Sequence, residues 1–453
     1  MRIFSTIILA MFVWMVSCGQ RENNTTTEVE ETKISDDSLM TLVQYRTFQY
    51  FWDGAEPTSL LARERIHLDG EYPENDRNVI TTGGSGFGVM AILVGIERGF
   101  ITRKEGFERL NHIVDYLEKA DRFHGIWSHW IHGETGKVKP FGYDDDGGDV
   151  VESAFLIQGL LTVRQYFKDG NEEEQAMANK ITKLYEAMEW SWYRNEKEEV
   201  MLWHWSPQYE FKRNHGLKGY DETMIAYILA ASSPTYPVDA SYYHKGWARD
   251  GAIKGESEPF GHLLELNHNG AKELGGPLFW AHYSYLALDP RGLKDQYADY
   301  WRHNVNHTLA NRAWCLENPN NFEGYGPHSW GLTASYSVKG YAAHAPGDNS
   351  DKGVISPTAA LSSFPYTPEH SMEAMRYWYE TYGDKLFGKY GFYDAFSVQE
   401  DWFPQRYLAI DQGPIVVMIE NHRTGLLWDL FMTSPEVKEG LDKLGFSSPH
   451  YSN

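Results

Sequence analysis

The segment from Tyr143 to Glu152 (YDDDGGDVVE) places five carboxylates within ten residues, directly before an apolar stretch. Apolar residues then recur at helical spacing, so the acids should lie at the amino end of a buried helix, where the helix dipole favours anions. Glycoside cleavage requires a carboxylic acid and a carboxylate across one bond. However, Asp149 and Glu152 also fit a capping box in which Asp replaces Ser or Thr. The motif alone leaves both interpretations open.

Composition narrows the class of partner. Acidic residues outnumber basic residues by 63 to 41, and the net charge of −22 repels phosphate backbones and anionic lipid headgroups. Aromatic residues form 15% of the 453-residue chain, and sugar rings stack on such faces, although most aromatic side chains must pack between helices. The chain contains neither an H-E-x-x-H motif nor a Cys pair. We therefore expect a saccharide ligand, no nucleic acid, and no metal or other cofactor.

The first eighteen residues are typical of an export signal. Arg2 precedes a largely apolar run that is too short to span a bilayer comfortably, and the run ends at Met15-Val-Ser-Cys18. The sequence around Cys18 resembles a bacterial lipobox, which implies cleavage before Cys18 and attachment of lipid to its thiol. We expect a lipoprotein anchored to the cell envelope, on the periplasmic or surface face of the outer membrane, with no other membrane contact.

The remainder of the chain divides at residue 37. Residues 19–37 contain no aromatic residue and are rich in Thr and Glu, so they should form a flexible tether. Residues 38–453 show no further shift in composition and are expected to form a single, monomeric domain. Cys315 is the only cysteine besides Cys18, so no internal disulfide is expected and Cys315 should be buried.

Helical periodicity dominates the chain from Ser38 onward. The expected helices cover residues 39–53, 86–98, 104–119, 150–167, 172–193, 222–231, 278–287, 295–316, 368–382 and 415–431. Short β hairpins are expected over residues 125–134 and 200–205. The pattern lacks the regular alternation of strands and helices found in a TIM barrel or a Rossmann fold.

Four expected helices share a preceding loop of Gly and polar residues. These loops are residues 81–88, 144–149, 219–222 and 411–414. Buried helices that carry functional groups at their amino ends suggest a double ring, whose inner helices run in the same direction and open at one mouth. The sequence therefore predicts an all-α (α/α)6 barrel, or toroid, with short β hairpins in its loops. About a dozen helices in one closed ring would use all of the chain.

Four separated segments also match a known family. They are YDDDGGDVVESAFLIQGLL, LWHWSPQYEF, GYDETMIAYILAASSPTYP and IDQGPIVVMIENHRTGLLW. The chain resembles the glycoamylase-like family, and more closely the β-1,2-glucan-cleaving enzymes of glycoside hydrolase family 144, from about Leu42 to Phe446. The resemblance implies an (α/α)6 barrel, hydrolysis with inversion at the anomeric carbon, and export to the cell envelope.

The resemblance also implies catalytic residues. Glu222 matches the acid of the family's Gly-aromatic-Asn/Asp-Glu motif and is the candidate general acid. Asp221 stands where Asn is more usual; its carboxylate would raise the pKa of Glu222, or it could be only an N-cap. Asp149 with Glu152, or Asp411, could supply the base. An inverting enzyme needs its two carboxyl groups about 6.5 to 9.5 Å apart, so the sequence leaves the base open.

Sugar binding needs flat aromatic faces and partners for hydroxyl groups. Side chains in loops or hairpins are better candidates than those on helices, although packing is the alternative role for each. The candidates are Trp127, Trp130, Trp203, His204, Trp205, Arg213 and Trp402. By contrast, Glu420 and Arg423 are three residues apart on one expected helix, where an intrahelical ion pair is their expected role.

Two other functions fit the same fold. One is hydrolysis or lyase cleavage of another polysaccharide, because a fold does not fix a reaction. The acidic chain disfavours an anionic polymer for this role. The other is a non-catalytic lipoprotein that binds a glycan without cleaving it.

Overall fold

Two kinds of helix alternate along the chain, and their sequences explain where each kind lies. The computed structural model describes residues 33–70, 72 and 76–451, which places the expected signal peptide, Cys18 and most of the tether outside the described residues. The α-helices are α1 (Asp36–Trp52), α2 (Thr82–Glu97), α3 (Arg103–Leu117), α4 (Val150–Phe167), α5 (Glu172–Glu186), α6 (Met224–Ser232), α7 (Tyr300–Glu317), α8 (Pro357–Leu361), α9 (Pro368–Leu386), α10 (Ala409–Arg423), α11 (Leu426–Met432) and α12 (Pro435–Lys443).

Helices α2, α4, α6, α8 and α10 are buried along almost their whole length, whereas α3, α5, α9 and α12 bury only one face. In α3, for example, Leu110, Ile113, Val114 and Leu117 are buried at helical spacing. An all-apolar helix has to be surrounded by protein, and an amphipathic helix can cover it. The prediction of a mainly helical body is confirmed.

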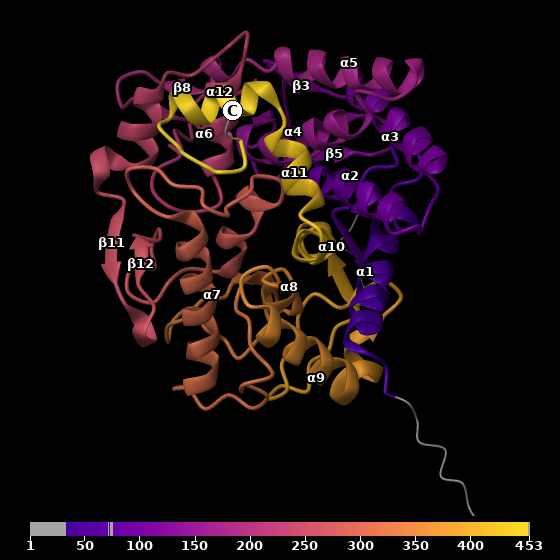
Figure 1. Cartoon of the computed structure of the whole chain (residues 1–453), viewed down its shortest axis with the longest axis vertical. Helices are drawn as coiled ribbons and strands as arrows, with labels where there is room; N and C mark the ends of the chain where they lie inside the picture. The colour runs from indigo at the N-terminus through magenta and orange to yellow at the C-terminus, as the bar shows by residue number, and fades with distance from the viewer. Residues whose placement is uncertain (1–32, 71, 73–75, 452–453) are drawn as a thin grey trace, which may run out of the picture. The chain divides into compact units, whose positions relative to one another are not determined.

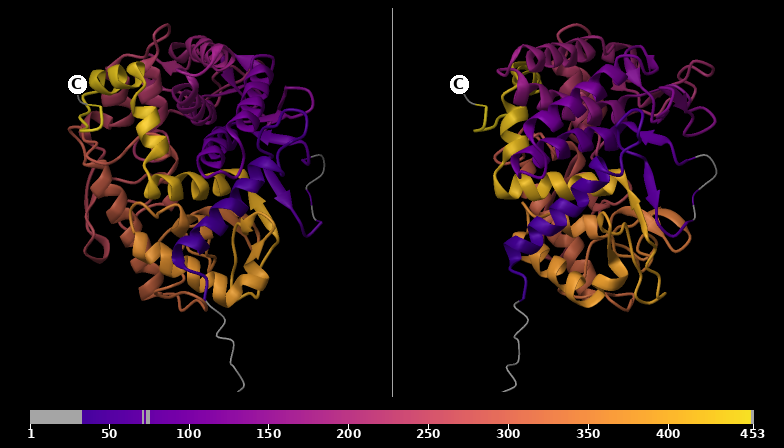
Figure 2. Two further views of the ribbon diagram at one scale, coloured as in Figure 1. Left: turned by 45° about the vertical axis from the view of Figure 1, so that its right-hand side comes forward. Right: turned by 90° about the vertical axis from the view of Figure 1, so that its right-hand side faces the viewer.

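Each buried helix packs against an amphipathic partner. The pairs are α2 with α3, α4 with α5, α6 with α12, α8 with α9, and α10 with α1, while α7 packs against the short 3₁₀ turns at Leu278–Ala281. Figure 1 shows α12, from the end of the chain, beside α6, and Figure 2 shows α1 crossing α10. Segments from both ends of the chain thus complete the helical layers.

The contact between α2 and α4 depends on glycine. A Cβ atom at Gly86 would lie 2.2 Å from the carbonyl oxygen of Phe155, and one at Gly159 would lie 2.2 Å from the carbonyl oxygen of Gly86. Only residues without a side chain allow this approach. The glycines of residues 81–88 therefore form the first turns of α2, rather than the loop that the sequence predicted before residue 86.

The strands are short and pair antiparallel. They are β1 (Arg65–His67), β2 (Val79–Thr81), β3 (Arg122–Phe123), β4 (Ile126–Trp127), β5 (Trp130–His132), β6 (Lys137–Lys139), β7 (Gly148–Asp149), β8 (Arg194–Asn195), β9 (Val200–Met201), β10 (His204–Trp205), β11 (Lys254–Ser257), β12 (Leu264–Leu266), β13 (Ala334–Ser337), β14 (Gly340–Ala343), β15 (Phe387–Gly388), β16 (Gly391–Phe392) and β17 (Arg406–Leu408). One sheet has the order β2-β5-β6, and the others each have two strands.

Both expected hairpin regions contain strands, but their pairing differs from the prediction. Residues 125–134 contribute to two hairpins, β3-β4 and β5-β6, and residues 200–205 divide between β9, which pairs with β8, and β10, which pairs with β7. In the last ladder His204 lies opposite Asp149. This non-local pairing brings the Trp-rich segment to the amino end of α4.

Several helix boundaries also differ. The expected helix over 415–431 breaks at Gly425, whose φ of +77° ends α10 before α11, and α10 begins early enough to place Pro414 inside it. Residues 278–287 form 3₁₀ turns instead of an α-helix, and α8 and α12 were not predicted. The first helix begins at Asp36, so the last two residues assigned to the tether are helical. Cys315 is buried on α7, as expected.

Within the described ranges, no helix has both the length and the apolar character needed to cross a bilayer.

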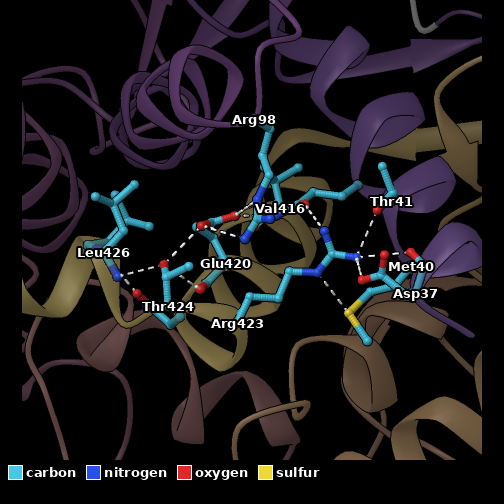
Figure 3. A network of polar contacts seen from close by, with 12 residues as sticks. Asp37, Met40, Thr41, Arg98, Val416, Glu420, Arg423, Thr424 and Leu426 are labelled. Carbon is cyan, nitrogen blue, oxygen red and sulfur yellow. Dashed lines mark hydrogen bonds and ion pairs between the residues drawn. The ribbon is translucent and has the colours of Figure 1, made fainter.

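A polar network ties the carboxyl end of α10 to α1 and α2 (Figure 3). Glu420 accepts hydrogen bonds from Arg98 Nε at 2.6 Å and Nη2 at 2.8 Å, and its side chain is only 2% exposed. Arg423 Nη2 instead reaches the carboxylate of Asp37 at 3.0 Å and the hydroxyl of Thr41 at 2.8 Å. The predicted pairing of Glu420 with Arg423 is therefore wrong, because tertiary packing supplies Glu420 with Arg98, directly after α2, and Arg423 with residues of α1.

We predict that Glu420→Gln lowers the free energy of unfolding by about 3 kcal/mol, because it leaves the Arg98 guanidinium without its counterion in a largely buried setting. Urea unfolding followed by circular dichroism would measure the change. The matched control is Glu439→Gln, which removes the exposed pair with Lys443 (2.9 Å) and should cost less than about 1 kcal/mol. Equal effects of the two substitutions would contradict the role given to Glu420.

Candidate active site

A cavity of about 360 Å³ lies where the amino ends of four buried helices meet. Its lining includes Thr81 before α2, Glu152 in the first turn of α4, Glu222 just before α6 and Ile410 in the first turn of α10. The carboxylic side chains in the lining are Glu64, Glu152 and Glu222, and the aromatic ones are His129, Trp130, Phe141, Phe155, Trp203, Phe279, Tyr283, Tyr336 and Tyr341. A mainly apolar cavity with a few convergent polar groups is typical of a small-molecule site.

Glu222 is the cavity residue best suited to remain protonated. Burial and the neighbouring Asp221 carboxylate raise the pKa of Glu222 well above its usual value, and Glu152 adds to the effect. Its backbone carbonyl accepts a 2.6 Å hydrogen bond from the Ser284 hydroxyl, which fixes the segment before α6. A carboxyl group that keeps its proton near neutral pH can donate it to a leaving group.

Asp221 is held as a hydrogen-bond acceptor behind Glu222. Its Oδ1 accepts from the Thr223 backbone N–H at 3.0 Å, and its Oδ2 accepts from Asn269 Nδ2 at 2.9 Å. Burial raises the pKa of Asp221 to about 6, against the opposing effect of these hydrogen bonds. Asp221 therefore forms a turn with Thr223, and α6 begins at Met224, two residues later than predicted.

Glu152 faces the amino end of α2. Its Oε2 accepts a hydrogen bond from the Gly83 backbone N–H at 2.8 Å, and the Thr81 hydroxyl lies 3.4 Å away. Asp149 caps α4 by accepting from the backbone N–H groups of Val151 and Glu152, both at 3.0 Å. The capping box considered from the sequence is therefore half formed, because the Glu152 carboxylate reaches α2 instead of returning to the cap.

Asp149 also holds His129 at the edge of the cavity. His129 Nδ1 donates to Asp149 Oδ2 at 2.9 Å. Burial alone would lower the pKa of His129, but Glu152 and Asp149 raise it to about 9, so the ring carries a positive charge at neutral pH. Burial lowers the pKa of His204 to about 4, which leaves that ring neutral although Asp149 Oδ2 is 3.6 Å away.

His129, Asp145 and Asp149 present possible metal-ligand atoms within 4.8 Å of one another. These atoms already have partners of opposite charge. Asp145 Oδ2 is 3.0 Å from Arg213 Nη1, and Asp149 bonds to the charged His129. Burial and the nearby Asp149 raise the pKa of Asp145 to about 7. A divalent cation would have to displace the Arg213 guanidinium and would require His129 to lose a proton, so the donor set does not fit a resident metal well.

Asp411 lies behind the cavity wall. It is buried in the first turn of α10, and among the residues that the structure describes neither carboxylate oxygen has a hydrogen-bond partner that fits normal geometry. Burial and the neighbouring Asp394 raise the pKa of Asp411 well above its usual value, while burial raises the pKa of Asp394 to about 6. The two buried carboxyl groups therefore resist being ionised together, next to the cavity residue Ile410.

The aromatic candidates divide into two groups. Trp130 and Trp203 line the cavity, whereas Trp205 packs against Trp192 and His124, and Trp402 packs against a small core cluster that includes Leu408. Trp127 is 0% exposed, and its Nε1 donates to the Leu117 carbonyl at 3.3 Å. A fully buried indole has no free face for a sugar, so the assignment of Trp127 to substrate binding is wrong.

The polar candidates have partners within the protein. His204 lies 3.3 Å from Asp145, beside the cavity residue Trp203. Arg213 forms ion pairs with Asp144 at 2.8 Å and with Asp145 at 3.0 Å. These contacts indicate that Arg213 mainly fixes the position of the acidic loop. The sequence could not show this pairing, because the two segments are almost seventy residues apart.

Sequence reasoning missed several cavity residues. Glu64 and Arg65 form an ion pair at the start of β1, and burial raises the pKa of Glu64. Tyr336 and Tyr341 lie opposite each other in the β13-β14 hairpin, and Tyr341 is 52% exposed. No motif marks these residues. The one available signal was the aromatic and glycine content of residues 320–353, which the hairpin occupies.

Comparisons with known proteins identify the family of this chain. The glycoamylase family, described as "Putative glucoamylase", matches residues 214–435. The endo-β-1,2-glucanase from Chitinophaga pinensis, solved with sophorotriose and glucose, is 66% identical; the match covers 92% of this chain and 100% of that chain, with a TM-score of 0.91. This chain belongs to the glycoamylase-like family.

Two further relatives match over nearly the whole of this chain. A "putative glucoamylase" from Bacteroides caccae is 60% identical over 91% of this chain and 100% of that chain, with a TM-score of 0.90. The exo β-1,2-glucooligosaccharide sophorohydrolase (non-reducing end) of Parabacteroides distasonis is 44% identical over 95% of this chain. The match covers 61% of that curated relative's length.

We predict that Asp221→Asn lowers the pKa of Glu222, because an ionised Asp221 carboxylate disfavours a second negative charge beside it. Burial should still hold the pKa of Glu222 above that of a free glutamate. Carbon-13 NMR of the side-chain carboxyl groups would follow the titration directly. The control is Asp239→Asn at an exposed position, which should leave the titration unchanged. An unchanged titration in Asp221→Asn would assign the raised pKa to burial alone.

Proposed function

We propose that this glycoamylase-like protein is a glycoside hydrolase that cleaves β-1,2-glucan, with Glu222 as general acid. The observation that carries the proposal is the position of Glu222, whose raised pKa favours the protonated form, in an aromatic cavity that also contains Glu64 and Glu152. Cleavage of a glycosidic bond by a carboxylic acid and a carboxylate requires this combination. The aromatic lining fits sugar rings, whose C–H faces stack on such side chains.

The choice of β-1,2-glucan as substrate comes from the relatives. One is an endo-β-1,2-glucanase solved with sophorotriose and glucose, and another is an exo-acting sophorohydrolase on β-1,2-glucooligosaccharides. The identity of 66% with the endo-acting relative, against 44% with the exo-acting one, favours cleavage within the glucan chain.

In the proposed reaction, the Glu222 carboxyl proton passes to the glycosidic oxygen as the bond to the anomeric carbon breaks. A second carboxylate removes a proton from a water molecule that attacks the opposite face of the sugar, so the configuration inverts. Glu152 is the base we favour, because its carboxylate lines the cavity and is anchored by the Gly83 N–H. Asp411 is the alternative, because it lies in the first turn of α10, whose amino end meets the cavity.

The helix pairing supports a closed (α/α)6 toroid as the architecture. Helices α2, α4, α6, α8 and α10 and the 3₁₀ turns at 278–285 would form the inner ring, and α3, α5, α12, α9, α1 and α7 would cover them in turn. The shared cavity at the amino ends of α2, α4, α6 and α10 is what a common inner-helix direction requires. Residues at the amino ends of several inner helices can then reach one substrate.

We predict that the purified body from Ser35 onward releases oligosaccharides from β-1,2-glucan and none from starch. Size separation over time would give mixed lengths for endo cleavage or one short product for exo cleavage. Proton NMR of the first products should show the α-anomer, because a β-bond is cleaved with inversion. Glu222→Gln should reduce the rate at least about 100-fold, the usual contribution of a general acid. Starch cleavage, or no product, would refute the substrate assignment.

The same assay identifies the base and tests the alternatives. Azide should restore turnover, with an α-glycosyl azide product, only in the variant that lacks the base, so Glu152→Gln and Asp411→Asn are compared directly.

The activity of the unmodified protein should fall at low pH, where the base is protonated, and at high pH, where Glu222 ionises. Binding of glucan without product in the unmodified protein would favour the non-catalytic lipoprotein, and unsaturated products would indicate a lyase.

We also propose that the protein is exported and anchored by lipid on Cys18, which lies outside the described residues. The lipobox-like sequence at Cys18 supports this proposal. In bacterial cells, we predict that the full chain incorporates labelled palmitate and fractionates with membranes, and that Cys18→Ser abolishes both. Cys315→Ser is the matched control and should retain the label. Labelling that persists in Cys18→Ser would refute lipid attachment at this residue.

A further inference from the structure

Two loops beside the cavity present aromatic side chains that the proposed mechanism does not use. Tyr143 from one loop, and Tyr209 and Lys212 from the other, form a surface that we call the outer aromatic patch. Tyr143 is 75% exposed, the largest exposed fraction among the strongly exposed large hydrophobic residues in the described part of the chain. A single exposed ring is ordinary, but exposed apolar groups that lie together can mark a binding site.

Ion pairs and backbone hydrogen bonds restrain the two loops that carry the outer aromatic patch. Arg213 Nε lies 2.8 Å from Asp144 Oδ1, and its Nη1 lies 3.0 Å from Asp145 Oδ2, so this one guanidinium fastens the loop of residues 141–146 to the loop of residues 206–213. The second loop is closed by backbone hydrogen bonds between Ser206 and Glu210, at 3.1 and 2.7 Å. Charge-assisted contacts from one planar guanidinium to two carboxylates restrain the geometry of both loops. The backbones that carry the exposed rings are therefore held together before any ligand arrives.

The patch combines an aromatic face with a hydrogen-bond donor. The ring centroids of Tyr143 and Tyr209 are 4.7 Å apart, with 39° between the planes. Lys212 Nζ lies 5.1 Å from the Tyr209 centroid and 5.8 Å from the Tyr143 centroid, within cation–π range. The hydroxyl contact with Tyr143 raises the pKa of Tyr209 to about 12. A sugar presents both an apolar C–H face and hydroxyl groups, and this surface offers a partner for each.

The outer aromatic patch continues from the cavity. Phe141 is 48% exposed, lines the cavity, and stacks on His129 with ring centroids 4.0 Å apart. Phe141 and Tyr143 are two residues apart, so the Cα of Tyr143 lies at most about 7 Å from that of the cavity residue. The cavity volume of about 360 Å³ is near the lower end of ligand pockets, which span about 300 to 1,000 Å³. A polymer bound there must extend outside it.

We propose that the outer aromatic patch is a sugar-binding site for the part of a neutral glucan chain that leaves the cavity next to Phe141. The proposal rests on the glucanase function proposed above. An anionic occupant is disfavoured, because Asp144 and Glu210 are next in sequence to the two tyrosines and the whole chain carries a net charge of −22. The patch would hold long chains on the enzyme while leaving the bonding of a short substrate within the cavity unchanged.

The experiment measures binding by a variant that cannot turn over substrate. In the Glu222→Gln background, Tyr143→Ala with Tyr209→Ala should weaken binding of long β-1,2-glucan about tenfold by calorimetry, the range expected for loss of stacked rings. Affinity for the β-1,2-linked trisaccharide should remain unchanged. Tyr236→Ala, at a 40% exposed tyrosine outside both loops, is the matched control and should change neither affinity.

The remaining outcomes are decisive. Unchanged affinity for the long glucan would overturn the proposal, as would an equal loss for both chain lengths, because the rings would then act on the cavity itself. If Glu222→Gln alone binds neither ligand, the glucan assignment fails and the outer site fails with it. If the double variant does not fold by circular dichroism, Tyr143→Ser at its highly exposed position provides the test, with a smaller loss confined to the long glucan.

Discussion

The site depends on the close packing of α2 against α4. Gly86 and Gly159 let the two helix backbones approach within a distance that any side chain would prevent. That approach brings the Gly83 N–H to 2.8 Å from Glu152, so the amino end of one buried helix stabilises a carboxylate on its neighbour. A Cβ atom at Gly83 would lie 2.6 Å from Glu152 Oε2, so the glycine sequence serves the site as well as the packing.

Burial and the neighbouring groups then give chemically similar carboxyl groups different pKa values. Asp149 receives two backbone hydrogen bonds and a charged His129, which lower its pKa although burial opposes this. Glu222 lacks such donors from neighbouring residues and lies beside Asp221, so burial and like charge raise its pKa. Asp411 and Asp394 share a third setting, in which two buried carboxyl groups resist being ionised together. Carboxyl groups at and around one small cavity therefore ionise at different pH values.

The loops around the cavity use ion pairs that join distant parts of the chain. Arg213 fastens the acidic loop before α4, and β10 pairs with β7 so that Trp203 enters the cavity. At the opposite end of α10, Glu420 and Arg98 join α10 to α2. Ion pairs between Arg and acidic residues thus position loops of the site at one end of the buried helices and stabilise the helix packing at the other end. The two roles differ only in the partners that each residue contacts.

Local patterns in the sequence determined much of the fold and part of the site. Apolar periodicity located α4 to the residue, and the acidic motifs correctly indicated Glu152 and Glu222 as residues at the amino ends of buried helices, since these features depend on neighbours within a few positions. The tertiary structure alone decided that Trp127 is buried, that Glu420 pairs with Arg98, and that Glu64 and Tyr341 enter the cavity. Those outcomes depend on contacts between residues far apart in the sequence, and a local pattern carries no information about them.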